Sequence, residues 1–147
     1  MSYEVHFDSK ELEALLKKLS REQMVAVLKR AISRGCVDLE KIVKTRSPVR
    51  ATGHLRAGWT HEVSSDGLEG MVGTDVRYAK IVEEGYSGVI RPTQAKALKL
   101  VFDGQTVYRA SARGQKGQHF VARVLEENQT LLADLAKQEA DALLEGT

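Results

Sequence analysis

The residue types that most often bind metal ions are few and scattered in this chain. Its four histidines are His6, His54, His61 and His119, and no two of them share a spacing that would place metal ligands on one helix or strand. The single cysteine, Cys36, has no second cysteine with which to form an internal disulfide. The sequence therefore does not predict a metal site.

Two short motifs have the composition of catalytic sites but not their spacing. Glu83 and Glu84 are adjacent carboxylates, yet general acid–base catalysis needs a positioned partner, which the neighbouring sequence does not supply. The segment Gly114-Gln115-Lys116-Gly117 lacks the spacing of a phosphate-binding loop. Cys36 falls within a predicted helix, where a thiol usually behaves as a small apolar side chain. We therefore predict that the chain is not an enzyme, and a hydrolase using Glu83 or His54 is only the third hypothesis.

Basic residues gather in two stretches of the sequence. The formal net charge is only +2, so binding to nucleic acid would have to depend on such local surfaces. Aromatic side chains that stack on bases are sparse there, with only Trp59 and Tyr108 close by. Solvated loop charge is the simpler interpretation, and a small nucleic-acid-binding module is the alternative function. The two stretches contain Lys41, Lys44, Arg46, Arg50 and Arg56, and Arg109, Arg113, Lys116 and Arg123.

Bulk properties indicate one domain, residues 1–147, with its own core. The chain has 147 residues, of which 42% are hydrophobic, which is enough to form a core without disulfides or metals. A lone cysteine fits a reducing compartment such as the bacterial cytoplasm. No stretch approaches the roughly 18 apolar residues that span a bilayer, so we expect no membrane contact.

Hydrophobic periodicity predicts helices at both ends of the chain. After a short strand at Tyr3–Phe7, Asp8 or Ser9 and then Ser20 are expected to cap two helices, the second running from Arg21 to about Arg46. Gly35 lies on the apolar face of that helix, which predicts a close approach by a neighbouring element. A last helix is expected from about His119 to Leu144, with Asn128 on its apolar face as a buried or interface residue.

The middle of the chain predicts strands. A basic surface loop from Pro48 to Gly58 precedes one hairpin, in which Trp59–Val63 and Leu68–Gly73 flank an Asp-Gly turn. A helical turn is expected from Tyr78 to Gly85, followed by extended chain at Val89–Pro92. A second hairpin pairs Leu98–Phe102 with Thr106–Ala110, and Ser111–Gln118 is expected to be a mobile loop. The predicted fold is α+β, with an antiparallel sheet of about four strands packed against the two long helices.

Several motifs, taken in order, resemble a phage family. They are Thr45-Arg46-Ser47-Pro48-Val49, Thr52-Gly53-His54-Leu55-Arg56, Val72-Gly73, Tyr78-Ala79-Lys80-Ile81-Val82-Glu83-Glu84-Gly85, Ile90-Arg91-Pro92, Lys96-Ala97-Leu98 and Gly117-Gln118-His119-Phe120-Val121. The chain resembles, over roughly residues 10 to 140, the tail-completion or head–tail joining family of the HK-ninety-seven gene-product-ten type. It departs from the family pattern at Ala51, where an acidic residue is usual, and at Gln118-His119, where a proline often precedes the aromatic residue.

The resemblance implies a structural subunit of a bacteriophage neck or upper-tail ring that joins the DNA-filled capsid to the tail, with no enzyme activity and no cofactor. We expect a homo-oligomeric ring, six- or twelve-fold, that contacts other phage neck and tail proteins and touches passing DNA non-specifically. It would be made in the host cytoplasm and reside in the virion. Ser111–Gln118 and Pro48–Gly58 would become ordered only in the ring.

The candidate interface or loop-anchoring residues are Arg50, Gly53, Leu55, Arg56, Tyr78, Val82, Glu83, Gly85, Arg91 and Phe120, and the candidate channel-facing cations are Arg46, Arg113 and Lys116. Arg56 and Glu83 are a candidate ion pair, within or between subunits.

Overall fold

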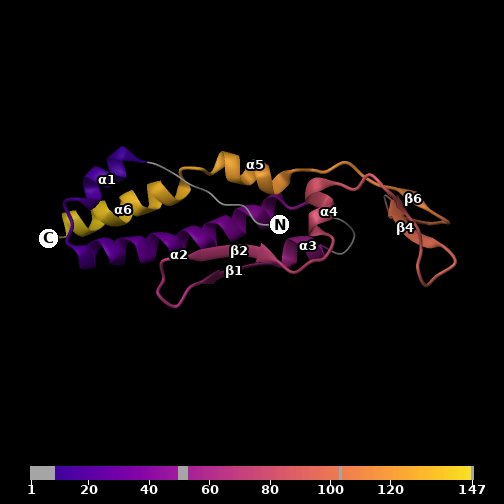
Figure 1. Ribbon diagram of the computed structural model, residues 1–147, viewed down its shortest axis with the longest axis horizontal. Coiled ribbons are helices and arrows are strands. Elements are labelled where there is room, and N and C mark those ends of the chain that lie inside the picture. Colours follow the sequence, from indigo (N-terminus) through magenta and orange to yellow (C-terminus); the bar gives the residue numbers. More distant parts are fainter. Residues whose placement is uncertain (1–8, 50–52, 103, 147) are drawn as a thin grey trace.

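The chain folds into an elongated helical body and an arm of short strands that projects from one end of it (Figure 1). The computed structural model describes residues 9–49, 53–102 and 104–146. The predicted strand Tyr3–Phe7 and the predicted site residue Arg50 lie outside the described residues.

Two serine-capped helices begin the body. Helix α1 (Lys10–Leu16) follows Ser9, whose hydroxyl accepts a hydrogen bond from the Leu12 amide. Helix α2 (Arg21–Arg46) follows Ser20, which forms a reciprocal capping box with Gln23. These caps satisfy backbone N–H groups that have no partner inside the helix. The predictions of both helices and of a serine cap at Ser20 are confirmed.

A two-stranded sheet packs along α2. Strands β1 (Trp59–Val63) and β2 (Gly70–Thr74) pair antiparallel and both contact α2. Gly70 allows the closest approach, since a Cβ built there would stand only 2.2 Å from Cys36 Sγ. The first predicted hairpin is therefore confirmed.

Two short helices form the end of the body from which the arm leaves. Helix α3 (His54–Ala57) corrects the prediction of a loop from Pro48 to Gly58, and it went unpredicted because it has four residues and no side-chain cap. Helix α4 (Ala79–Glu84) confirms the predicted helical turn. It ends at Gly85, whose φ of 84° favours glycine.

The arm consists of two small antiparallel sheets. Strand β3 (Val89–Ile90) pairs with β6 (Ala112–Arg113), and β4 (Leu98–Phe102) pairs with β5 (Gln105–Arg109). The second predicted hairpin is thus confirmed. The prediction of a loop at Ser111–Gln118 is corrected at Ala112–Arg113, which form β6, and the mobility of the segment stays a prediction.

The predicted C-terminal helix is divided in two. Helix α5 (Phe120–Glu127) and helix α6 (Leu131–Glu145) are separated at Asn128, whose φ of −120° is not helical. The Asn128 side chain donates a hydrogen bond to the Val124 carbonyl at 2.8 Å, and so occupies an acceptor at the end of α5. The expectation of one continuous helix was wrong because asparagine ends the first part by competing for backbone groups.

The α+β class is confirmed, but the predicted sheet is not continuous. The described strands form three two-stranded sheets, and only β1–β2 packs against α2. Sheet β4–β5 lies at the far end of the arm, well away from both long helices (Figure 1). The predicted packing of four strands against the helices is corrected in this respect.

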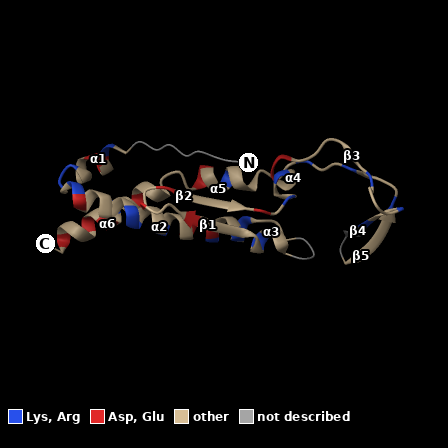
Figure 2. Cartoon of the chain, turned by 60° about the horizontal axis from the view of Figure 1, so that its bottom comes forward, with Lys and Arg blue, Asp and Glu red and all other residues tan. Residues whose placement is uncertain are grey.

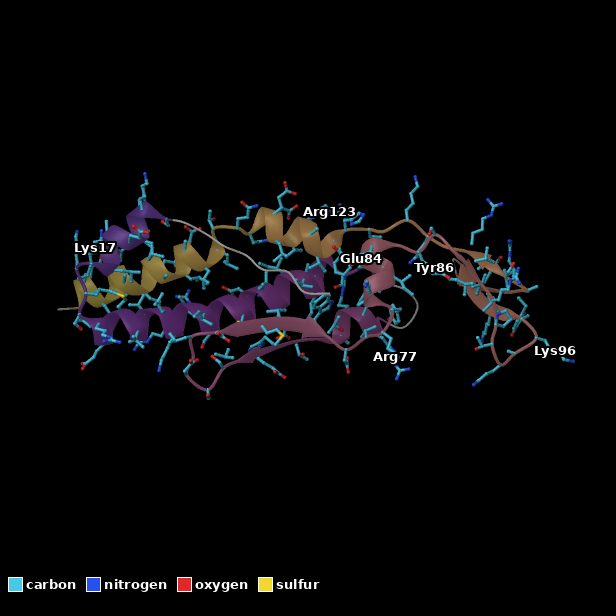
Figure 3. All side chains as sticks on the ribbon, in the orientation of Figure 1. Lys17, Arg77, Glu84, Tyr86, Lys96 and Arg123 are labelled. Atoms are coloured by element: carbon cyan, nitrogen blue, oxygen red, sulfur yellow. The ribbon has the colours of Figure 1, made fainter. Side chains whose placement is uncertain are left out.

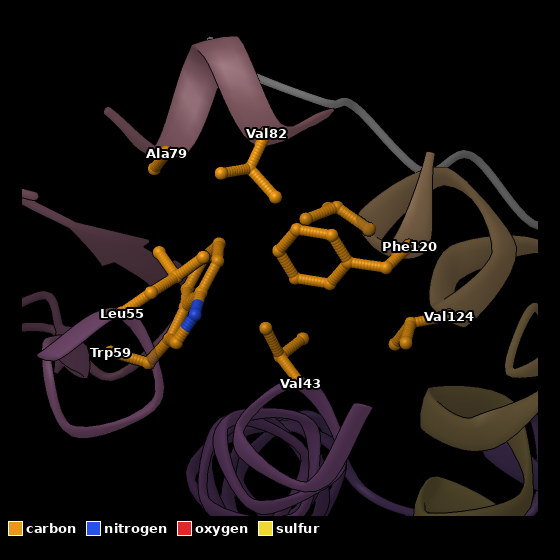
Figure 4. Packing of buried hydrophobic residues seen from close by; sticks show 8 residues of the cluster. Val43, Leu55, Trp59, Ala79, Val82, Phe120 and Val124 are labelled. Carbon is orange, nitrogen blue, oxygen red and sulfur yellow. The ribbon is translucent and has the colours of Figure 1, made fainter. Parts of the chain in front are cut away.

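Two apolar clusters stabilise the body. One joins α1, α2 and α6 around Val27, and the other joins α2, α4, α5 and the sheet around Trp59 and Phe120 (Figure 4). The rings of Trp59 and Phe120 pack edge to face with centroids 6.1 Å apart. Gly35 permits the contact between α2 and α6, because a Cβ there would stand 3.3 Å from Leu132 Cδ1. The close approach predicted at Gly35 is confirmed.

Candidate functional site: the projecting arm

The arm, residues 86–116, extends from the body in a direction that leaves most of its surface open. Tyr86 lies where it begins and Lys96 near its outer end, whereas Lys17 marks the opposite end of the molecule (Figure 3). Several large aromatic or aliphatic side chains among the described residues of the arm are exposed. They are Tyr86, Val89, Ile90 and Tyr108, and Tyr108 is 66% exposed.

Glycines fix the root of the arm, where its two chain segments pass each other. The Tyr86 amide donates to the Gln115 carbonyl at 2.9 Å, and the Gly114 amide donates to the Gly88 carbonyl at 2.8 Å. A Cβ on Gly114 would stand 1.6 Å from the Tyr86 carbonyl oxygen, inside its van der Waals radius. The two backbone segments therefore lie closer together at Gly114 than a residue with a side chain would permit.

Gly85 and Gly117 continue this contact into the body. A Cβ on Gly85 would stand 2.4 Å from the Gly117 nitrogen, and one on Gly117 would stand 2.4 Å from the Glu83 carbonyl oxygen. Lys116 forms an isolated bridge with Gly85, so this predicted channel-facing cation lies at the root. The arm thus leaves the body through a narrow, well-ordered connection.

Glu83 joins the root to helix α5. Its side chain is fully buried, and its two carboxylate oxygens accept hydrogen bonds from the Val121 and Ala122 amides, each at 3.0 Å. His119, the residue before α5, adopts a left-handed φ of 47° and gives no side-chain cap. Glu83 therefore caps α5 from α4, and its charge interacts favourably with the positive end of the α5 dipole.

Three other predicted anchoring residues belong to the apolar cluster beside the root. Leu55, Val82 and Phe120 are each at least 95% buried and pack in the cluster shown in Figure 4. Tyr78 differs, because it precedes α4 and is 42% exposed. Leu55, Val82 and Phe120 contribute to the core that holds α3, α4 and α5 together.

Arg56 and Glu83 have separate hydrogen-bonding partners. Arg56 Nη2 donates to the backbone carbonyls of Thr45 and Ser47, both at 3.2 Å, and so binds the C-terminal end of α2. The Glu83 carboxylate binds the start of α5 instead. Gly53, with a φ of 63°, allows the chain to enter α3 in the left-handed conformation. The predicted pair of Arg56 with Glu83 does not form within one chain, where both residues are described; between subunits it stays a prediction, and it would require the buried Glu83 carboxylate to become accessible.

The arm is strongly basic, unlike the rest of the chain. It contains six Lys or Arg residues against one Asp, whereas the other residues together contain 16 Lys or Arg against 19 Asp or Glu. Blue segments along the arm in Figure 2 mark these residues. All six cations are exposed, and they are Arg91, Lys96, Lys99, Arg109, Arg113 and Lys116.

Arg46, the third predicted channel-facing cation, lies elsewhere. It ends α2 and pairs with Glu127 at 2.7 Å, so its charge is partly neutralised. Lys44 on the same helix pairs with Glu40, which also contacts His61. The structure therefore brings Arg91, Arg113 and Lys116 together on the arm and leaves Arg46 on the body.

An acidic surface and an apolar groove were not predicted from the sequence. Residues 59–76, which form the β1–β2 hairpin, contain Glu62, Asp66, Glu69 and Asp75 but no Lys or Arg, and all four carboxylates are exposed. Counting charges over this window alone would have found the surface. The groove depends on contacts between distant segments, so no local pattern indicated it.

The groove, of about 900 Å³, lies over α2 between β2 and the α5–α6 junction. Its lining includes the continuous segment from Gly70 to Arg77, so the backbone of β2 forms one wall. Partly buried apolar side chains form much of the remaining surface, among them Ile32, Leu39, Val72, Leu125 and Leu132.

Burial raises the pKa of the Cys36 thiol, so this side chain stays protonated at neutral pH. Among the described residues, no three His, Cys, Asp or Glu side chains gather closely enough to hold a metal ion. No helix within the described ranges is both long and apolar enough to cross a bilayer.

Comparisons with known proteins connect this architecture with phage tails. Residues 10–85 match the family model described as "Bacteriophage HK97-gp10, putative tail-component". That match covers α1 to α4 and includes the segment around Tyr78, Val82, Glu83 and Gly85. No curated protein and no solved structure matches the chain. More than half of the chain fits the family model, and the protein therefore belongs to the HK97-gp10-like family of bacteriophage tail components.

Proposed function

We propose that the chain is a non-enzymatic subunit of a ring at the neck or upper tail, where the DNA-filled capsid joins the tail. The observation that carries this proposal is the arm. A two-stranded hairpin is marginally stable alone in water, and β4–β5 lies on the arm away from both long helices, so a contact with a neighbouring subunit would stabilise it. A tail component that extends such a hairpin is suited to bind neighbouring subunits.

The root residues have a defined role in this proposal. We infer that the close backbone contacts at Gly85, Gly114 and Gly117, together with the Glu83 cap, restrict the arm to one angle with the body. A fixed angle reduces the conformational entropy lost when subunits associate. The same geometry repeated in every copy favours a closed ring of six or twelve subunits that docks on neck and tail partners.

Light scattering over a range of protein concentrations, combined with negative-stain imaging, tests the ring. We expect particles whose mass is six or twelve times the 16.3 kDa of one chain. If the free chain stays single, the same measurement is repeated with phage tails that lack this protein. Failure to form a ring both alone and on the tails would contradict the proposal.

The second candidate function, a small nucleic-acid-binding module, is favoured by the six exposed cations of the arm. The Lys41–Arg56 stretch supports it less, because Lys44 and Arg46 already pair with carboxylates. This function predicts that the single chain binds duplex DNA and that binding weakens steeply as salt rises. Changing Arg91, Arg113 and Lys116 to Ala would weaken that binding.

A further inference from the structure

We propose that the arm of one copy docks on the acidic β1–β2 hairpin of the next copy, with β4–β5 lying along the open edge of β2 above the groove. This inference rests on the proposed ring and names its subunit contact. The occupant is a second copy of this chain, so each subunit gives one arm and receives another.

Charge complementarity is the first argument. The arm has a surplus of five positive charges, and residues 59–76 have four carboxylates with no Lys or Arg among them. Oppositely charged surfaces increase the rate at which two copies meet and favour one relative orientation between them. Glu62, Glu69 and Asp75 are available for such contacts, whereas the Asp66 side chain already accepts from Ser64 and Leu68.

The open edge of β2 is the second argument. Among the described strands, β2 pairs only with β1, and the residues from Gly70 to Arg77 line the groove continuously. An unpaired edge presents backbone donors and acceptors to which another strand can add. Met71, 66% exposed on β2, offers an apolar contact for an added strand.

The direction of the arm is the third argument. The arm extends away from the body in both views (Figures 1 and 2), and none of its described residues lines the groove of its own chain. The glycine contacts at the root oppose a large rotation. The arm and the groove are different surfaces, so their contact is head to tail and repeats around a ring if the rotation closes.

Charge reversal on the two surfaces tests this contact. In the first variant, the arm changes Lys96→Glu, Lys99→Glu and Arg109→Glu leave two acidic surfaces. In the second variant, the hairpin changes Glu62→Lys, Glu69→Lys and Asp75→Lys leave two basic surfaces. Each variant alone should associate at least about tenfold more weakly than the unaltered chain, because like charges face each other.

Mixing the two variants distinguishes docking from other effects. In a mixture, each acidic arm meets a basic hairpin and each basic arm meets an acidic hairpin, so alternating rings should form again. A control variant carries three reversals at the opposite end of the molecule, Glu13→Lys, Glu22→Lys and Glu145→Lys, and should assemble normally. Circular dichroism checks that every variant is folded, and light scattering reports assembly.

The outcomes separate this inference from the proposed ring. If the unaltered chain forms rings but the reversed variants also do so, or if their mixture fails to assemble, arm docking is wrong and the ring stands. If the arm reversal abolishes binding to a mixed-sequence DNA duplex and leaves assembly unchanged, the arm contacts nucleic acid instead. If the unaltered chain never assembles, even on tails, both proposals fail.

Discussion

At the scale of single residues, the most informative side chain is Glu83, a carboxylate that is completely buried yet hydrogen-bonded. It replaces the missing side-chain cap of α5 and also joins α4 to the returning end of the arm. Its neighbour Glu84, one position later, is exposed and pairs with Lys80 at 3.8 Å. Two adjacent glutamates therefore have different roles, and the sequence alone gave no means of distinguishing them.

We predict that Glu83→Gln destabilises the fold, whereas Glu84→Gln does not. The Gln side chain keeps one acceptor oxygen but turns the other into a donor, which would then face an amide N–H. Losing one charged hydrogen bond in a buried place should cost about 1–3 kcal/mol. Urea unfolding of both variants measures this, and the Glu84 variant should stay within about 0.5 kcal/mol of the unaltered chain. Equal stability of the two variants would show that the cap is unimportant.

The cluster of Glu40, His61 and Lys44 predicts a dependence of stability on pH. Hydrogen bonds from His61 and Lys44 lower the pKa of Glu40 below its ordinary value of 4.5. A lowered pKa in the folded state means that the stabilisation is present above the unfolded pKa and is lost as pH falls through the folded pKa. The unaltered chain should therefore lose more stability than Glu40→Gln when the pH falls from about 5 to about 3. Unfolding midpoints in urea at several pH values test this, and parallel losses in the two proteins would disprove it.

At the scale of secondary-structure elements, local signals predicted more than non-local ones. Ser20 predicted the start of α2, and the structure shows that it caps the helix together with Gln23. The Asp66-Gly67 turn predicted the first hairpin in the same way. Sheet membership was not predictable, because whether β4–β5 joins β1–β2 depends on packing between distant segments. The role of Asn128 was predicted only in part. An asparagine on the apolar face of a helix can be a buried residue or can end the helix, and only its contacts with α5 distinguish these two roles.

The candidate site divides in the same way. Among the candidate interface residues, Val82, Glu83 and Gly85 of the Tyr78–Gly85 motif lie at or beside the root of the arm, and their role in an interface stays a prediction. The sequence analysis grouped Arg46 with Arg113 and Lys116. In the structure Arg46 lies at the end of α2, where it pairs with Glu127, whereas Arg113 and Lys116 lie on the arm. The groove and the acidic hairpin depend on which elements become neighbours, and no single motif specifies that.

The root of the arm gives a prediction at the same scale. Replacing Gly114 by Ala would bring a Cβ to 1.6 Å from the Tyr86 carbonyl, so the two segments must separate and their hydrogen bonds must lengthen. We expect faster amide hydrogen exchange in β3 and β6 and unchanged exchange in α2. Gly73→Ala is a suitable control, because a Cβ there meets nothing within 4 Å. Similar exchange in both variants would indicate that the root tolerates a side chain.

At the scale of the whole molecule, the body and the arm differ in how they are stabilised. The body has two apolar clusters, and their buried residues, as far as the structure describes them, all lie outside the arm. The arm has exposed apolar side chains, a surplus of positive charge and a narrow connection to the body. Such a division suits a subunit whose body folds first and whose arm acquires its stabilising contacts on assembly.

This division predicts that the body folds without the arm but no longer assembles. A variant in which residues 87–113 are replaced by a short Gly-Ser linker keeps both clusters, Glu83 and the α5 cap. We expect its thermal midpoint to fall by only a few degrees, because about 1 kcal/mol shifts the midpoint of a domain of this size by roughly 2–8 °C. Its mass in light scattering should be that of one chain at every concentration, since the surplus of positive charge and the hairpin are both gone. Calorimetry and light scattering on one sample measure both quantities together. Loss of folding would mean that the arm stabilises the body directly. Assembly at the same concentration as the unaltered chain would mean that other surfaces hold the ring together.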